Sequence, residues 1–405
     1  MLSVPEARAA ILAALAPRPA TRVPLAEACG RCLSEPAVAT VDSPPFAKAK
    51  MDGYATNAAE CGSSHVTLTV VEEIPAGAVP TRSVGPGECA KIMTGAPLPD
   101  GADVVIPVEC SERIVDRVSL SPPPAVRPGS CVMARGAAVR WGETLIAAGE
   151  PLTPAAIGLL AEHGFDPVAV TPKLRVAVLS TGDEVVPASL PPGPGQIRDA
   201  NGPLLCAAIA AAGALPLPLG LAGDDRDALT AKVRDGLNAD VLLISGGVSM
   251  GDYDLVPGVL ADCGVRRVFH KINVKPGKPL WFGVTENDRG PTAVFGLPGN
   301  PVSSLTGFEL FVRPALRRLG GWSDCEPAPL SATLTEAIAN RGDRPLYRPV
   351  RLTDGPAGLS AEPVRWAGSG DLRGAADANG AALIPSESQL AAGDRVDAIR
   401  WAGCG

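Results

Sequence analysis

The fold is decided by Val241-Leu-Leu-Ile-Ser-Gly-Gly-Val-Ser-Met-Gly-Asp-Tyr-Asp254, where four apolar residues run into a glycine-rich turn that ends in two acids. The run 241–244 predicts a fully buried strand, because it is short, apolar and partly β-branched. The glycines of the turn let the backbone approach a ligand, and its N–H groups suit an anion at the start of the next helix. Asp252 and Asp254 suit a cation or a hydroxyl group. Since ligands of open α/β sheets bind at the carboxyl ends of strands, we predict a site here.

The composition excludes several classes of protein. A chain of 405 residues predicts more than one domain. Lys plus Arg total 36 against 43 for Asp plus Glu, a net charge of −7, and no basic block is present, so we expect no nucleic-acid partner. No apolar run reaches the roughly 18 residues of a membrane span, and the N-terminus lacks a signal-peptide pattern. We therefore expect a cytoplasmic protein with no membrane partner.

The cysteines and histidines do not predict a metal or redox centre. The ten cysteines are scattered, and only Cys29 and Cys32 form a Cys-x-x-Cys pair. A redox or zinc role would need a thioredoxin-like setting or a second ligand pair, and neither is visible. His65, His163 and His270 lie far apart in the sequence and lack metal-ligand spacing.

Apolar periodicity predicts the secondary structure. Residues 4–15 predict an amphipathic helix, and residues 66–139 predict a small all-β body because turn residues recur throughout. Thr153 suits the N-cap of a further helix. From 174 to 319 strands alternate with helices, which predicts βαβ units and a parallel sheet. The expected strands are 174–180, 215–221 and 241–245, and the expected helices are 202–212, 227–237, 256–262 and 301–319. Pro216 and Pro218 place their strand at an edge of the sheet or make its start irregular.

Four further segments at strand ends carry polar groups. They are Ser180-Thr-Gly-Asp-Glu184, Gln196-Ile-Arg-Asp-Ala-Asn201, Lys271-Ile-Asn-Val-Lys-Pro-Gly-Lys-Pro279 and Gly296-Leu-Pro-Gly-Asn-Pro-Val-Ser303. Each has a structural alternative as a capped turn, a solvated loop or a tight turn, and Asp224 and Asp225 also suit a helix N-cap. Together, the lysines and turn amides suit a phosphorylated or other anionic ligand, and the carboxylates suit Mg²⁺. No Walker-type loop, Gly-x-Gly-x-x-Gly motif or Ser/His/Asp arrangement is present, so nucleotide hydrolysis and hydride transfer are not predicted.

An ordered set of motifs spans most of the chain. It comprises Pro-Pro-Phe at 44–46, Met51-Asp-Gly-Tyr-Ala55, Ile92-Met-Thr-Gly-Ala-Pro97, Ser180–Glu184, Ser245–Asp254, Lys275-Pro-Gly-Lys-Pro279 and Gly296-Leu-Pro-Gly-Asn-Pro301. Any one of these motifs is weak evidence, but the ordered set is specific. In this order they resemble the MoeA family of molybdopterin molybdotransferases.

The elements and the resemblance together predict an α/β plus all-β fold. We expect an N-terminal helix at 1–21, an irregular bridging domain at 22–44 and 139–173, a β domain with the Met-Asp-Gly-Tyr motif at 45–138, a parallel-sheet, molybdopterin-binding-like α/β domain at 174–324, and a C-terminal β-barrel at 325–405. From its residues alone, the last region fits either a small barrel or a sandwich.

The resemblance also implies a reaction. It implies transfer of molybdenum from molybdate into adenylylated molybdopterin, with release of AMP and with Mg²⁺ assisting. It implies a homodimer whose site lies between the α/β domain of one subunit and the Met-Asp-Gly-Tyr domain of the other. The expected partners are a molybdopterin adenylyltransferase and the molybdoenzymes, or their chaperones, that receive the cofactor.

The resemblance implies functional roles for Asp52, Thr94, Glu184, Asp225, Asp254, Pro298 and Pro301, and residue chemistry adds the remaining residues of the predicted site. Asp52, Glu184 and Asp254 are the predicted catalytic residues, and Asp254 and Glu184 are also the predicted Mg²⁺ ligands. The predicted substrate-binding residues are Thr94, Ser180, Thr181, Gly182, Asp225, Ser245, Gly246, Gly247, Ser249, Lys275, Lys278, Pro298, Asn300, Pro301 and Ser303.

The chain departs from the family pattern at two places. Ala47, Lys48 and Ala49 follow Pro-Pro-Phe where the family often has Asp, then Asn or Lys, then Ser. Gly136-Ala-Ala138 lacks both acids of the family's Gly-Glu-Asp turn, and Lys50 either faces molybdate or is a solvated lysine. These changes keep open a non-catalytic binding or scaffold protein on the same fold. A molybdopterin adenylyltransferase, which shares the glycine turn, is a second alternative that the flanking β regions disfavour.

Overall fold

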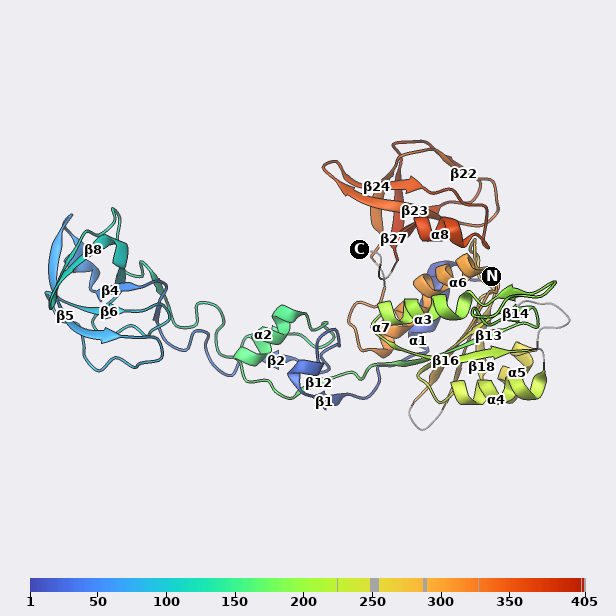
Figure 1. The fold of residues 1–405 in the computed structure, drawn as a ribbon, viewed down its shortest axis with the longest axis horizontal. Helices are drawn as coiled ribbons and strands as arrows, with labels where there is room; N and C mark the ends of the chain where they lie inside the picture. The colour runs from blue at the N-terminus through green and yellow to red at the C-terminus, as the bar shows by residue number, and fades with distance from the viewer. Residues whose placement is uncertain (224, 248–254, 287–289, 327, 402, 404–405) are drawn as a thin grey trace. The chain divides into compact units, whose positions relative to one another are not determined.

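The computed structural model describes residues 1–223, 225–247, 255–286, 290–326, 328–401 and 403. Its internal contacts divide the chain into two compact units (Figure 1). Unit 1 comprises Met1–Glu35, Ala148–Ile157 and Pro167–Gly405, and unit 2 comprises Pro36–Ala147 and Gly158–Asp166. The finer division into five parts remains a prediction from the sequence.

The centre of unit 1 is a six-stranded sheet in the order β16-β13-β17-β20-β19-β18. The strands are β16 (Leu215–Ala222), β13 (Arg175–Thr181), β17 (Val241–Ser245), β20 (Thr292–Leu297), β19 (Trp281–Thr285) and β18 (Arg266–His270). The first four are parallel to one another, but β19 is antiparallel to both of its neighbours. The predicted parallel sheet is present in these four strands, and the antiparallel strand β19 extends it into a mixed sheet. Residues 286–291, which join β19 to β20, are too few for a parallel crossover of about a dozen residues.

The strand β16 lies at the edge of this sheet, as its prolines predicted. Pro216 and Pro218 pair with β13, and the register shifts between Val178 and Leu179, just beyond the pairing of Pro218. Because proline lacks the N–H that a second neighbouring strand would need, the edge is the position where it costs least.

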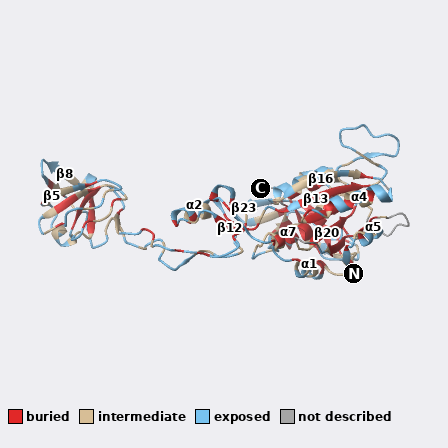
Figure 2. Cartoon of the chain, turned by 90° about the horizontal axis from the view of Figure 1, so that it is seen from below, coloured by how far each residue is buried: buried red, intermediate tan, exposed pale blue. Residues whose placement is uncertain are grey.

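Helices cover both faces of the sheet. Val241 and Leu243 belong to one buried cluster, which also contains residues of α1 (Val4–Ala13), α3 (Asn201–Ala211), α6 (Pro301–Gly307) and α7 (Arg313–Leu319). Leu242 and Ile244 belong to a second cluster with α4 (Arg226–Gly236) and α5 (Val256–Asp262). This alternation is the two-residue period of a strand that is buried on both faces. Figure 2 shows the buried strands β13 and β20 in red. The predicted helix 301–319 is interrupted by a π turn at Phe308–Val312 between α6 and α7.

The C-terminal region of unit 1 forms a closed five-stranded barrel, which settles the choice between a barrel and a sandwich. Its strands, in spatial order, are β21 (Leu330–Leu334), β24 (Gly358–Pro363), β23 (Leu346–Gly355), β25 (Gly380–Ile384) and β27 (Arg395–Arg400). Accompanying elements of unit 1 are α8 (Leu372–Asp377) and the strand pairs β22 (Ile338–Asn340) with β26 (Ser388–Leu390), β14 (Val185–Val186) with β15 (Ile197–Arg198), and β1 (Thr21–Val23) with β12 (Val168–Val170). A 3₁₀ helix, η1, lies at Leu25–Glu27.

Unit 2 contains a β-sheet in the region where recurring turns predicted β structure. Its six-stranded sheet has the order β7 (Val104–Pro107), β4 (Gly53–Thr56), β6 (Glu88–Ile92), β5 (Val66–Ile74), β9 (Arg117–Leu120) and β8 (Ser111–Ile114). Shorter elements are β3 (Lys48–Ala49) with β10 (Val132–Met133), β2 (Ala37–Val38) with β11 (Thr144–Ile146), and the 3₁₀ helices η2 (Ala58–Cys61) and η3 (Val108–Cys110). The helix α2 spans Pro154–Glu162, of which the part to Ile157 belongs to unit 1, and its predicted N-cap is present because the Thr153 hydroxyl accepts a hydrogen bond from the Ala156 amide.

None of the helices in the described part of the chain combines the length and apolar character that a membrane span requires.

Candidate functional site

A cavity of about 550 Å³ lies at the carboxyl ends of β13, β17 and β20, within the size range of ligand pockets. The predicted residues among its lining are Ser180, Thr181, Gly182, Glu184, Ser245, Gly246, Gly247, Asn300 and Pro301. These residues lie at the ends of β13, β17 and β20 or shortly after them, and the three strands are neighbours in the sheet. This is the edge at which the ligands of open α/β sheets bind.

Hydroxyl groups at the strand ends are held in fixed positions. Ser180, Thr181 and Ser245 are only 3%, 6% and 2% exposed. The Ser180 hydroxyl donates to Asp199 Oδ1 at 3.1 Å, and the Thr181 hydroxyl donates to the Ser245 carbonyl oxygen at 3.3 Å. The Thr181 bond joins the ends of β13 and β17, and the Ser180 bond joins β13 to the segment before α3; both satisfy hydroxyl groups that would be costly to bury without a partner.

The turn after β17 requires glycine at two positions. Gly246 and Gly247 have φ values of 93° and 63°. A Cβ atom at Gly246 would lie 2.6 Å from the Thr181 carbonyl oxygen, and one at Gly247 would lie 2.7 Å from Val256 Cγ2. The Gly246 amide donates to the Leu297 carbonyl oxygen at 3.1 Å, so it is already paired and is not one of the predicted anion-binding amides.

Two carboxylates line the same cavity. Glu184 is exposed and folds back over Gly182, where an added Cβ atom would lie 2.5 Å from Glu184 Oε2. Asp199 is half-buried, and its Oδ1 also accepts a hydrogen bond from the Gly202 amide at 2.9 Å. No group of three or more possible metal-ligating side chains occurs among the described residues. A protein usually contributes only one or two carboxylates to a Mg²⁺ site, and substrate phosphates and water supply the other oxygen atoms.

The turn between β20 and α6 forms another wall. Asn300 is the N-cap residue of α6 and, like Pro301, lines the cavity. The carbonyl oxygen of Pro298 accepts a hydrogen bond from the Ser304 hydroxyl at 2.6 Å. Pro298 and Ser303 are both buried and do not line the cavity, so they support this wall from behind.

The predicted lysines lie outside the cavity lining. Lys275 and Lys278 are exposed, and neither side chain forms an ion pair or hydrogen bond within the described residues. The backbone of Lys275 bonds to Pro345 and Tyr347 of the barrel region, each at 2.8 Å. A Cβ atom at Gly277 would lie 3.7 Å from the Ser303 carbonyl oxygen, so the lysine loop adjoins α6.

Of three other predicted residues of the α/β region, the structure describes only Asp225, which does not line the cavity. Asp225 caps α4 by accepting a hydrogen bond from the Ala228 amide at 2.7 Å, which supports its structural alternative. Ser249 and Asp254 lie outside the described residues, as does Asp224.

Asp52 and Thr94 lie together in unit 2. Asp52 Oδ1 accepts hydrogen bonds from the Thr94 hydroxyl and amide, both at 2.7 Å. These two bonds, the hydroxyl first, hold the pKa of Asp52 below its usual value of 3.8. A Cβ atom at Gly53 would lie 2.0 Å from the Ile106 carbonyl oxygen, so the glycine of the Met-Asp-Gly-Tyr motif lets β4 pack closely against β7.

Some lining residues are absent from the predicted set. Arg198, Asp199 and Asn201 line the cavity. They belong to a segment whose polar groups the sequence had singled out, but they were not included among the predicted site residues. Gly370, just before α8, and Leu372, the first residue of α8, also line it, and the Val302 amide donates to the Ser369 carbonyl oxygen at 3.0 Å. No local sequence signal marks this contact, because it depends on how the barrel region packs against α6.

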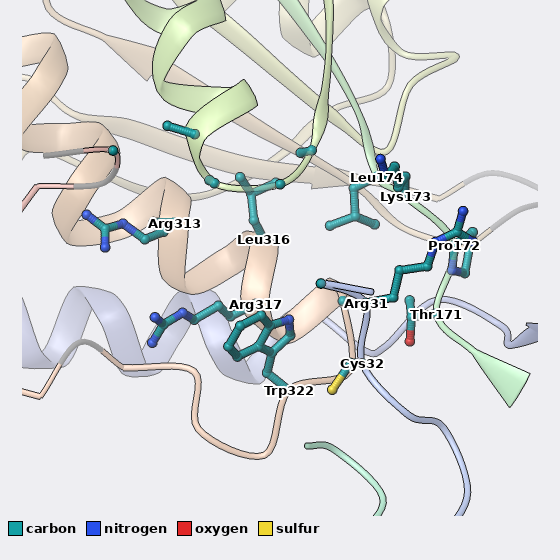
Figure 3. Close-up of a pocket in the computed structure, with 17 residues that line it drawn as sticks. Arg31, Cys32, Thr171, Pro172, Lys173, Leu174, Arg313, Leu316, Arg317 and Trp322 are labelled. Carbon is teal, nitrogen blue, oxygen red and sulfur yellow. The ribbon is translucent and has the colours of Figure 1, made fainter. Parts of the chain in front are cut away.

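A second cavity in unit 1, of about 270 Å³, contains none of the predicted site residues (Figure 3). Figure 3 shows Arg313 and Arg317 on one side of Leu316, with Arg31 and Lys173 on the other. Arg317 lies over the ring of Trp322 at 5.0 Å. The lining also includes the C-terminal ends of α3 and α7, where the helix dipole favours cations. The basic side chains therefore do not converge on one point, and we place the functional site at the strand ends.

Comparison with known proteins identifies the family. The model of the MoeA N-terminal region (domain I and II) matches residues 2–164, that of a probable molybdopterin binding domain matches 177–318, and that of the MoeA C-terminal region (domain IV) matches 331–401. The chain belongs to the MoeA family. The family predicted from the ordered motifs is thereby confirmed.

MoeA relatives match nearly the full length of the chain. Molybdopterin molybdenumtransferase 2 of Mycobacterium tuberculosis (strain ATCC 25618 / H37Rv) is 36% identical over 391 residues, which cover 94% of each chain. Molybdopterin molybdenumtransferase of Nostoc sp. is 36% identical and covers 90% of this chain and 84% of its own. A crystal structure of a molybdopterin biosynthesis MoeA protein from Pyrococcus horikoshii OT3 has a TM-score of 0.83 with 28% identity, covering 99% of this chain and 100% of its own. These full-length matches include the β regions, which a molybdopterin adenylyltransferase was not expected to have.

Proposed function

We propose that this MoeA-family protein inserts molybdenum from molybdate into adenylylated molybdopterin and releases AMP. The observation that carries the proposal is the polar cavity at the ends of β13, β17 and β20. It combines buried hydroxyl groups, two carboxylates and two turns in one space of about 550 Å³, which is large enough for part of a nucleotide-linked substrate. Relatives that share 36% of the sequence are named molybdopterin molybdenumtransferases.

In this proposal the cavity acts by binding and orientation rather than through a covalent nucleophile. Ser180, Thr181 and Ser245 present hydroxyl groups whose positions are fixed by hydrogen bonds. Holding reactants in one geometry lowers the entropic part of the barrier and avoids solvent reorganisation. Lys275 and Lys278, outside the lining, provide positive charge for the approach of anionic substrates.

Mg²⁺ fits the carboxylates of this cavity. Glu184 is exposed in the lining, and we propose that it holds the ion together with Asp254, which lies outside the described residues. Substrate phosphate oxygens would complete the shell, as is usual for Mg²⁺. When bound, the ion supplies positive charge that stabilises the departing AMP.

We further propose that the protein acts as a cytoplasmic homodimer. Asp52 and Thr94 of a second subunit would then serve the cavity of the first, since these residues are exposed in unit 2. A molybdopterin adenylyltransferase would supply the substrate, and molybdoenzymes or their chaperones would receive the product.

The proposal is tested with purified protein, adenylylated molybdopterin, molybdate and Mg²⁺. AMP release is followed by chromatography, and cofactor formation by reconstitution of an apo-molybdoenzyme. We expect both products to appear together and to require molybdate. AMP release no faster than in a reaction without protein would reject the proposed function.

A further inference from the structure

The side chain of Asn201 links the turns at the ends of β17 and β20, beyond the backbone pairing of these two strands. Its Nδ2 atom donates to Ser245 Oγ and to the Gly299 carbonyl oxygen, each at 2.7 Å. Ser245 ends β17, and Gly299 lies between β20 and α6. Both hydrogens of the amide nitrogen are therefore used to connect two walls of the cavity.

The orientation of this amide is determined by its partners. The Gly299 carbonyl oxygen can only accept a hydrogen bond, so the nitrogen rather than the oxygen of the Asn201 amide must face it. Asn201 is the first residue of α3, yet it does not cap that helix. At the start of α3 it is the side chain of Asp199 that accepts a hydrogen bond from a helical amide, that of Gly202. The side chain of Asn201 thus serves the connection between the turns.

The bonds around Asn201 form a continuous network across the cavity floor. Ser245, which accepts from Asn201, also accepts at its carbonyl oxygen from the Thr181 hydroxyl at 3.3 Å. The Gly246 amide then bonds to Leu297 at 3.1 Å. These bonds join the end of β13 to that of β17, and the end of β17 to that of β20. Among the described residues, Asn201 provides the only side-chain hydrogen bond to Gly299.

We propose that Asn201 is a positioning residue that sets the spacing between the Ser245–Gly247 turn and the Gly299–Pro301 turn. The proposal rests on the proposed function, because it assumes that both turns bind the reacting substrate. Asn201 acts through these turns, so it controls the transition state more than the initial binding of substrate. A displacement of about 1 Å in such a site costs on the order of 100-fold in rate.

The test uses Asn201→Asp in the full-length protein. The two side chains have the same shape, but the carboxylate cannot donate and places an oxygen against the Gly299 carbonyl. Asn201→Ala is the second variant, since it removes both bonds without repulsion. Asn57→Asp is the matched control, because Asn57 Nδ2 also donates to a backbone carbonyl, that of Gly101, in unit 2.

Two measurements are made on each variant. Hydrogen exchange follows the amides of Gly246 and Val302, which are bonded to Leu297 and Ser369. Steady-state kinetics gives kcat and KM for adenylylated molybdopterin. In both Asn201 variants we expect these amides to exchange at least about tenfold faster, with exchange in the barrel unchanged. We expect kcat to fall about 100-fold and KM to change less than about threefold. Asn57→Asp is expected to leave all of these values unchanged.

Unchanged exchange of the Gly246 amide and of the Val302 amide, which directly follows the second turn, would overturn the proposal, as would faster exchange with full kcat. Faster exchange throughout the protein would also overturn it, because Asn201 would then be a general structural residue. A wild-type protein that releases no AMP would reject the proposed function instead. The exchange of Gly246 and Val302 would still decide whether Asn201 positions the two turns.

Discussion

One carboxylate oxygen of Asp52 accepts two hydrogen bonds from Thr94, one from its hydroxyl and one from its amide, each at 2.7 Å. The hydroxyl bond and then the amide bond hold the pKa of Asp52 below its usual value of 3.8. Hydrogen bonds to an ionised carboxylate favour that form over the neutral acid. The Met-Asp-Gly-Tyr motif therefore presents a fixed negative charge at neutral pH.

Thr94→Val removes the hydroxyl donor and keeps the amide. We expect the pKa of Asp52 to rise toward 3.8 and kcat to fall about tenfold, since one hydrogen bond to a charged group is lost. Because the pKa is lowered in the folded state, this bond stabilises the fold above the unfolded pKa and ceases to do so as pH falls through the folded value. Wild type and variant should therefore converge in stability in acid. Carbon NMR titration of Asp52 measures the shift, and Thr94→Ser, which keeps the hydroxyl, should retain the wild-type value.

Glu184→Gln tests the proposed Mg²⁺ ligand. Glu184 is exposed in the cavity lining, so its substitution should change the free energy of unfolding by less than about 0.5 kcal/mol. We expect kcat to fall by about 100-fold, as when one electrostatic contact to a transition state is removed. For Asp254→Asn, at a position outside the described residues, we expect a similar fall in kcat. Glu362→Gln, on the exposed side of β24, is the control. If Glu184→Gln lowers the melting temperature along with the activity, the Glu184 carboxylate is structural.

The sequence predicted the strand-end part of the site for a physical reason. Parallel strands bring their carboxyl ends to one edge, so Ser180 and Ser245 had to meet once their strands were neighbours. The edge position of β16 followed from Pro216 and Pro218 in the same way, because proline lacks a donor. These properties are local, and they survive in any correct packing of the elements.

Other features depend on tertiary contacts that no local pattern carries. Gly370 reaches the cavity only because the barrel region packs against α6. The charge of Lys275 indicated an anion, yet its backbone is tied to Tyr347 and its side chain lies outside the lining. The antiparallel strand β19 was missed because Trp281–Thr285 is a short apolar run without flanking helices, and such runs do not reveal their direction.

Gly246→Ala, compared with a control, separates the free-energy cost of backbone strain from that of overpacking at the glycine turn. A side chain at φ 93° is strained, and its Cβ atom would also lie 2.6 Å from the Thr181 carbonyl oxygen. Gly213→Ala is the control, because Gly213 has φ 80° but no atom within 4 Å of an added Cβ. We expect the control to lose about 1–2 kcal/mol of unfolding free energy from backbone strain. Gly246→Ala should lose roughly 1–3 kcal/mol more from overpacking, as measured by urea denaturation. Equal losses would mean that close packing does not explain this glycine.

Lys275→Gln and Lys278→Gln test the role of exposed charge. The protein has a net charge of −7, so an anionic substrate needs a local positive field to approach it. Both lysines are exposed, and salt shortens the range of such fields from about 10 Å at 0.1 M to about 3 Å at 1 M. We expect each variant to raise KM for adenylylated molybdopterin roughly five- to tenfold at low salt, on the scale of about 1 kcal/mol per exposed charge contact. The difference from wild type should shrink as salt is added, whereas Lys173→Gln, an exposed lysine at the other cavity, should leave KM unchanged. A rise in KM that is the same at low and high salt would contradict an electrostatic role and would mean that these lysines act by direct, desolvated contact with the substrate.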